Sequence, residues 1–81
     1  MFKNKNNLSN NLCGANVKKY RTNYPTKLSQ RGLSDLLQLE GLDLDKNAVQ
    51  RIESGQRFVT DIELKTIAEV LGVSLDDLLH E

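Results

Sequence analysis

Four helix-start signals direct this 81-residue chain toward a helical fold. At each one, a short polar side chain of the type preferred at helix N-caps precedes a segment whose apolar residues recur at helical spacing. Strand signals are nearly absent, so the sequence predicts an all-α fold without a sheet. The four predicted N-cap residues are Ser29, Asp45, Thr60 and Ser74.

The same pattern predicts five short helices. Pro25 closes the first one, because the residue before a proline disfavours the α conformation. Gly55 and Gly72 are expected to end the third and fourth helices, and Thr60 and Glu63 have the spacing of a capping box. Residues 39–46 leave open whether the second helix extends by a further turn. The predicted helices cover approximately residues 15–23, 29–40, 46–54, 61–71 and 75–79.

Each predicted helix has an apolar side that should face a shared core. For the first helix, the apolar residues include Cys13, which comes just before the predicted start of the helix. For the last helix, they are its three leucines. The residues predicted to point inward are Cys13, Val17, Tyr20 and Tyr24, then Leu33, Leu36 and Leu37, then Ala48, Val49 and Ile52, then Leu64, Ile67, Ala68 and Leu71, and finally Leu75, Leu78 and Leu79.

Composition indicates one small globular domain. Apolar residues make up 38% and charged residues 27% of the chain, and no apolar run approaches the roughly 20 residues of a membrane helix. The Asn-rich start has no apolar secretion segment, which favours a cytoplasmic protein. We expect residues 1–11 to be a disordered basic leader and residues 12–81 to form the folded domain. One cysteine and one histidine predict no disulfide, no metal site and no cofactor.

The net charge is zero, but the charges are unevenly distributed. Residues 1–31 contain seven cations and no acid, whereas residues 58–81 contain six acids and one cation. Such a chain can present a basic surface to a polyanion and a different surface elsewhere. The alternative is chance clustering in a short sequence. The basic leader itself is either a DNA-contacting arm or an uninvolved tail.

The predicted third helix has an unusual outward face. At 100° per residue, Ala48, Val49 and Ile52 fall on one side of the segment "KNAVQRIES" (46–54). The opposite side carries cations, planar amides and a hydroxyl, with no carboxylate. The residues of that polar side are Lys46, Asn47, Gln50, Arg51 and Ser54.

Three segments resemble the phage-repressor and Cro-like helix-turn-helix family of DNA-binding domains. They are "LSQ" (28–30), "VQRIESGQR" (49–57) and "IAEVLGVSLDDLL" (67–79), and the resemblance spans about four-fifths of the chain. It implies a compact five-helix bundle of the lambda-repressor-like type. The connections at residues 22–27 and 39–46 are longer than is usual in the family, which leaves the placement of Ser29 and Gln30 against the third helix open.

The resemblance also implies roles for individual residues. In the family, the third helix lies in the major groove, which makes Lys46, Asn47, Gln50 and Arg51 the expected base-contacting residues. The expected phosphate-contacting residues are Gln30, Gln56 and Arg57. The family also pairs an arginine near the end of the first helix with the glutamate that closes the third, here Arg21 and Glu53. The alternative is that the polar residues are ordinary surface or turn residues.

The leading functional hypothesis is therefore a sequence-specific regulator of transcription, a repressor that binds double-stranded DNA. It would act as a homodimer, formed in solution or only on DNA, with no small-molecule substrate and no membrane partner. The alternative is an antitoxin or adaptor that uses the same fold to bind a protein, although such a module should present apolar anchors. An enzyme is not expected, because the sequence offers no nucleophile and base pair.

Overall fold

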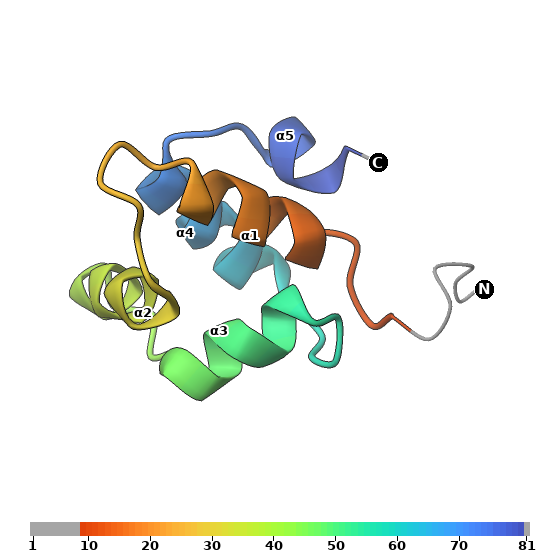
Figure 1. Cartoon of the computed structure of the whole chain (residues 1–81). Helices are drawn as coiled ribbons and strands as arrows, with labels where there is room; N and C mark the ends of the chain where they lie inside the picture. The colour runs from red at the N-terminus through yellow and green to blue at the C-terminus, as the bar shows by residue number, and fades with distance from the viewer. Residues whose placement is uncertain (1–8, 81) are drawn as a thin grey trace.

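The computed structural model describes residues 9–80, which form five α-helices and no β-strand (Figure 1). Each helix begins and ends within one residue of its predicted bounds. The prediction of an all-α, five-helix fold is therefore confirmed. In chain order the helices are α1 (Gly14–Thr22), α2 (Gln30–Leu39), α3 (Lys46–Glu53), α4 (Asp61–Leu71) and α5 (Leu75–Leu79).

Local hydrogen bonds explain why four of the helices begin where they do. Each predicted N-cap side chain accepts a hydrogen bond from a backbone N–H in the first turn of its own helix, which satisfies a donor that has no partner within the helix. At α4 and α5 a first-turn carboxylate accepts a bond from the cap residue in return, forming two capping boxes. The pairs are Ser29 with Gly32, Asp45 with Ala48, Thr60 with Glu63, and Ser74 with Asp77.

Glycines in the left-handed conformation follow three of the helices, with Gly41 (φ 87°) just after α2. Gly55 (φ 82°) comes just after α3, and Gly72 (φ 72°) caps α4. Residues with a Cβ are disfavoured in this region, so these positions suit glycine. The long connection after α2 adds no further helical turn, because α2 ends at Leu39. The side chain of Leu44 is buried in the core and anchors that connection.

A single apolar core holds the helices together. Val17, Leu33 and Leu37 lie in it with side chains that are almost completely inaccessible to solvent. Tyr20, Tyr24 and Leu64, also predicted to point inward, are partly buried at its edge. The buried apolar residues are Cys13, Val17, Leu33, Leu37, Leu44, Ala48, Val49, Ile52, Ile67, Ala68, Leu71 and Leu78.

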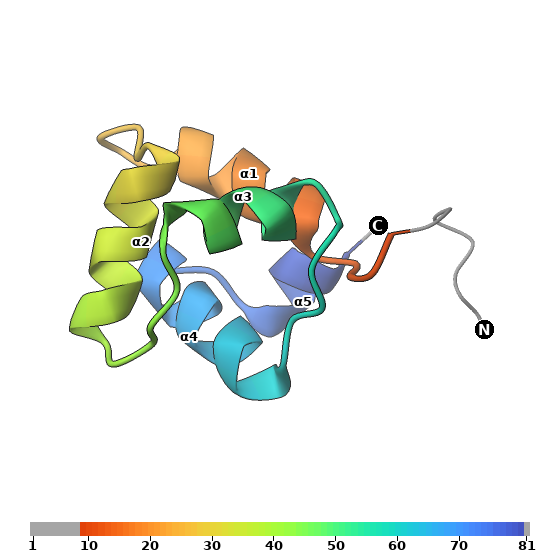
Figure 2. The same ribbon diagram turned by 90° about the horizontal axis from the view of Figure 1, so that it is seen from below.

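The arrangement of the helices separates α3 from α5. The α3 helix packs against α1 and α2, whereas α5 packs against α1 and α4. As a result, α3 and α5 lie at opposite sides of the molecule with α1 and α4 between them (Figures 1 and 2). The outward face of α3 is therefore open to solvent along its length.

Two of the three leucines predicted to point inward from α5 are exposed instead. Leu78 is buried, but Leu75 and Leu79 are 44% and 40% exposed. The prediction was wrong for these two because α5 has only five residues. Only one side of so short a helix can pack against α1 and α4, and Leu78 occupies that side.

Residues 9–11, which the sequence analysis assigned to the N-terminal leader, form hydrogen bonds in this structure. Asn10 donates from its backbone N–H to the carbonyl of Gly55 at 2.7 Å, and Asn11 donates from its side chain to the carbonyls of Ile52 and Arg57 at 3.1 and 2.8 Å. These residues therefore pack against the end of α3. Residues 1–8, for which disorder was also predicted, lie outside the described residues.

Within the described part of the chain, none of the helices has both the length and the apolar character needed to cross a membrane.

Candidate nucleic-acid interface

The four side chains predicted to contact bases lie together on the exposed face of α3. Lys46, Asn47, Gln50 and Arg51 are all exposed, because the three apolar residues of the same helix point into the core. Within residues 9–80, none of these four side chains takes part in a hydrogen bond or an ion pair. The face thus offers donors and acceptors of hydrogen bonds that are not used inside the domain.

A buried ion pair joins α3 to the rest of the domain. Arg21 of α1 donates through Nε and Nη2 to the two carboxylate oxygens of Glu53, at 2.6 and 2.9 Å. The Arg21 side chain is 10% exposed and that of Glu53 is 4% exposed. Arg21 also donates through Nη1 to the carbonyl of Leu28 at 2.8 Å. This is the pair that the sequence resemblance implied, and it connects α1, α3 and the segment before α2.

Gln30, a predicted phosphate contact, lies beside that ion pair. Its Nε2 donates to Oε1 of Glu53 at 3.0 Å, so the start of α2 packs against the end of α3 despite the long connection between them. Because Gln30 is the first residue of α2, its backbone N–H has no acceptor within the helix. A backbone donor at a helix N-terminus is a favourable partner for an anion.

Gln56 and Arg57, the other predicted phosphate contacts, follow α3 in the turn that leads to α4. Gln56 is exposed, and its backbone N–H donates to the carbonyl of Arg51 at 2.9 Å. Arg57 forms an ion pair with Glu63 of α4, with N···O distances of 2.8 and 3.0 Å. The pair raises the pKa of Arg57 and lowers that of Glu63, because each hydrogen bond favours the charged forms of both groups.

Within residues 58–80, the acidic residues lie on α4 and α5. The α5 helix is on the far side of α1 and α4 from α3 (Figure 1), so its carboxylates do not border the exposed face of α3. The acids of these two helices are Asp61, Glu63, Glu69, Asp76 and Asp77.

Cys13 is buried at the start of α1, where removal from water raises the pKa of its thiol to about 11. The thiol is therefore protonated at neutral pH and is a poor nucleophile. In the described part of the chain, no three His, Cys, Asp or Glu side chains lie close enough together to hold a metal ion.

Comparison with known families assigns the fold. A family model described as helix-turn-helix matches residues 17–78. The chain belongs to the helix-turn-helix family. The match includes α2 and α3, whose packing and exposed face are described above, and it confirms the resemblance found in the sequence. Members of this family are DNA-binding regulators of transcription, which places the chain in that class.

Two solved structures resemble the helix-turn-helix chain in both fold and sequence. The restriction-modification controller protein C.AhdI from Aeromonas hydrophila is 31% identical, with 80% of this chain and 84% of that protein aligned at a TM-score of 0.67. The DNA-binding domain of BldD is 28% identical, with 88% and 93% aligned at a TM-score of 0.69.

A third structure shares the fold at lower sequence identity. The hypothetical transcription factor NHTF from Neisseria is 23% identical, with 98% of this chain and 82% of that protein aligned at a TM-score of 0.72. A search among curated protein sequences found no significant match.

Sequence reasoning missed two residues that shape this surface. Asn11 was assigned to the leader, yet its amide bonds the end of α3 and its Oδ1 accepts from the backbone of Gly14 at 2.7 Å. Glu63 was identified as a capping residue, but its ion pair with Arg57 was not predicted. The opposite charges six residues apart were the available signal for that pair, since Gly55 and the capping box already indicated a turn between α3 and α4.

Proposed function

We propose that this protein is a sequence-specific repressor of transcription that places α3 in the major groove of double-stranded DNA. In helix-turn-helix proteins the second helix of the motif enters the groove, and its N-terminal residues contact base edges. The observation that carries the proposal is the exposed face of α3, whose four polar side chains have no partner within residues 9–80.

The chemistry of that face suits the contacts made in a major groove. Asn47 and Gln50 carry planar amides, which can bond N6 and N7 of adenine together. Lys46 and Arg51 can bond O6 and N7 of guanine. No apolar side chain is exposed among the outward residues of α3, so the face has no anchor of the kind that dominates protein-protein interfaces.

Contacts to phosphate would flank α3 on both sides. At one side, Gln30 would donate from its backbone N–H at the start of α2. At the other, Gln56 and Arg57 would donate from the turn after α3. Phosphate contacts position a protein on the duplex but carry little sequence information.

The proposed assembly is a homodimer bound to two half-sites. One domain contacts only a few base pairs, and dimeric helix-turn-helix proteins extend the site by binding two half-sites about one helical turn apart. Leu75 and Leu79 on α5 provide exposed apolar surface that does not overlap the polar face of α3. We assign the contact between the two copies to this part of α5.

The test compares variants on a selected DNA site and on scrambled DNA. A preferred site would first be selected from a random duplex pool. Replacing Asn47 or Arg51 by Ala should then weaken binding to that site by roughly 1–3 kcal/mol, with a smaller loss on scrambled DNA. Arg57→Ala should weaken both about equally and lower the salt dependence by about one ion. Lys65→Ala, which removes an exposed cation of α4, is the control and should bind like the parent.

The repressor proposal fails if the α3 variants bind the selected site as tightly as the parent. That result would leave the face of α3 as an ordinary solvated surface. It would favour the alternative of a protein-interaction module built on the same fold.

A further inference from the structure

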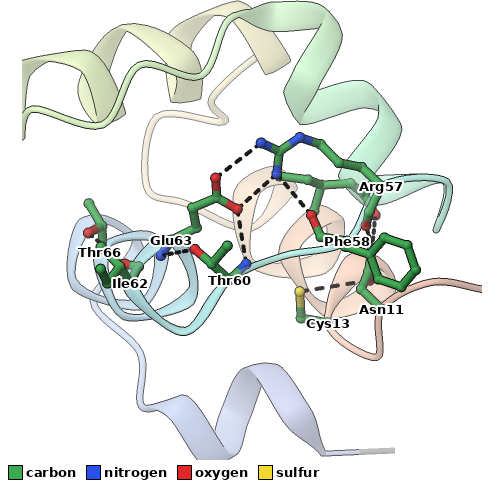
Figure 3. Close-up of polar contacts among 9 residues, drawn as sticks. Asn11, Cys13, Arg57, Phe58, Thr60, Ile62, Glu63 and Thr66 are labelled. Carbon is green, nitrogen blue, oxygen red and sulfur yellow. Dashed lines mark hydrogen bonds and ion pairs between the residues drawn. The ribbon is translucent and has the colours of Figure 1, made fainter.

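The guanidinium of Arg57 is held by Glu63 through one of its edges. Nη1 donates to Oε1 and Nη2 donates to Oε2 of the carboxylate, at 2.8 and 3.0 Å, and Nη1 also donates to the carbonyl of Phe58 at 3.0 Å (Figure 3). These three bonds use both N–H groups of Nη1 and one of the two on Nη2. The carboxylate of Glu63 therefore occupies the edge of the guanidinium that is formed by Nη1 and Nη2.

The remaining donors of Arg57 lie along a second edge. A guanidinium has five N–H groups in one plane, and here the Nε–H and the other Nη2–H make no bond within the described residues. These two point in nearly the same direction, which is the geometry for binding two oxygens of one phosphate. The Arg57 side chain is 29% exposed, so the ion pair with Glu63 leaves part of it accessible to solvent.

Both ends of the Arg57–Glu63 pair are fixed by other bonds. Oε1 of Glu63 accepts a bond from the backbone N–H of Thr60 at 3.1 Å, as part of the capping box that starts α4 (Figure 3). The backbone of Arg57 donates to the carbonyl of Arg51 at 3.2 Å and accepts from the side chain of Asn11 at 2.8 Å. The guanidinium is therefore held in one orientation before any ligand binds.

We propose that Glu63 is a positioning residue, which orients Arg57 so that its Nε and Nη2 edge binds a DNA phosphate. This inference rests on the proposed function, since it concerns how one of the phosphate contacts is made. It predicts that Arg57 keeps its bond to Glu63 in the complex. A long flexible side chain held in its bound orientation loses less conformational entropy on binding.

The opposite role for Glu63 is competition with the phosphate. The carboxylate of Glu63 would repel a DNA phosphate that comes close to it. If the Arg57 guanidinium also had to break its bond to Glu63 in order to bind the phosphate, removing the carboxylate would strengthen DNA binding. The two roles therefore predict changes of opposite sign in the affinity of a Glu63 variant for DNA.

The experiment measures binding of Glu63→Gln to a mixed-sequence duplex at two salt concentrations. Glutamine also serves at this position of a capping box, so α4 should start as before, and thermal unfolding would check it. We expect the affinity to fall roughly three- to tenfold, as for two residues in direct contact. Asp61→Asn removes a charge from the same turn of α4, where no cation among residues 9–80 pairs with it, and should leave binding unchanged or slightly stronger.

A second background separates positioning from a general effect on the fold. In Arg57→Gln, the additional change Glu63→Gln should cause no further loss of affinity or of salt dependence. An equal loss of affinity in both backgrounds would assign Glu63 a structural role only. Unchanged binding by Glu63→Gln alone would mean that Glu63 has no role in binding, and tighter binding would mean that it competes with the phosphate. Each of these results overturns the inference.

Failure of the proposed function gives a different pattern. In that case the parent does not bind the duplex, and both proposals fall together. If the parent binds and Arg57→Gln weakens binding, but Glu63→Gln has no effect that depends on Arg57, only the inference about Glu63 is wrong.

Discussion

Arg21 and Glu53 are the charged residues that matter most for the position of α3. Their side chains are almost completely buried and are paired with each other. Arg21 also donates to the carbonyl of Leu28, and Glu53 also accepts from the side chain of Gln30. A buried charge without a partner is costly, since its solvation by water has been lost. The network therefore restricts how α3 can sit against α1 and α2.

We predict that Glu53→Gln lowers the free energy of unfolding by about 3 kcal/mol, near the lower end of the cost of breaking a buried pair. The variant leaves the Arg21 guanidinium buried beside a neutral group. Chemical denaturation at neutral pH would measure the change. Glu69→Gln alters an exposed residue of α4 that forms no ion pair among residues 9–80, and should change stability by less than about 0.5 kcal/mol. A change in Glu53→Gln below about 1 kcal/mol would indicate an exposed pair instead.

At the scale of elements, α1 and the C-terminal end of α3 approach each other very closely. A Cβ built on Gly14 would lie 2.3 Å from the carbonyl oxygen of Ile52 and 3.1 Å from that of Glu53. Backbone atoms at such distances cannot move aside alone, so α1 reaches α3 only because residue 14 has no side chain. The bonds from Asn11 close the same junction.

Gly14→Ala should therefore lower the free energy of unfolding by about 1–3 kcal/mol or more, the range for overpacking a buried site. It should also weaken DNA binding in proportion to any displacement of α3. Gly32→Ala makes the same substitution in the first turn of α2, where the nearest neighbours are the side chains of Ser29 and Leu28 at 3.3 and 3.4 Å. That control should stay within about 1 kcal/mol of the parent. Equal thermal stability of the two variants would refute a tight junction at Gly14.

For the whole molecule, the separation of α3 from α5 divides the surface into two parts. One side carries the polar face of α3, and the other carries the acidic residues of α5 with Leu75 and Leu79. The polar face of α3 and the leucines of α5 therefore do not overlap. DNA bound at α3 would leave the proposed dimer contact uncovered.

Replacing both Leu75 and Leu79 by Gln should reduce binding to DNA with two half-sites while leaving binding to one half-site unchanged. The exposed apolar area of these leucines would be lost from the contact between copies, whereas the core residue Leu78 remains. Sedimentation velocity with each DNA would count the bound copies. Leu39→Gln changes a leucine of α2 that is 80% exposed and serves as the control. Undiminished cooperative binding by the double variant would assign the dimer contact to another surface.

The sequence alone determined the number, order and approximate bounds of the helices. The reason is physical, since caps and turns depend on hydrogen bonds between residues two to four positions apart. Asp45 bonds Ala48, and Thr60 bonds Glu63, so neither bond needs the rest of the chain. The exposed face of α3 followed from helical periodicity for the same reason.

Only the tertiary structure decided which surfaces are covered and which distant groups meet. Leu75, Leu78 and Leu79 are alike in the sequence, and packing against α1 and α4 separates the buried one from the two exposed ones. Asn11 bonds residues more than 40 positions away, and the orientation of Arg57 toward Glu63 depends on the path of the turn between α3 and α4. Such contacts depend on how the elements pack in space, which the local hydrogen bonds and periodicity of single helices do not specify.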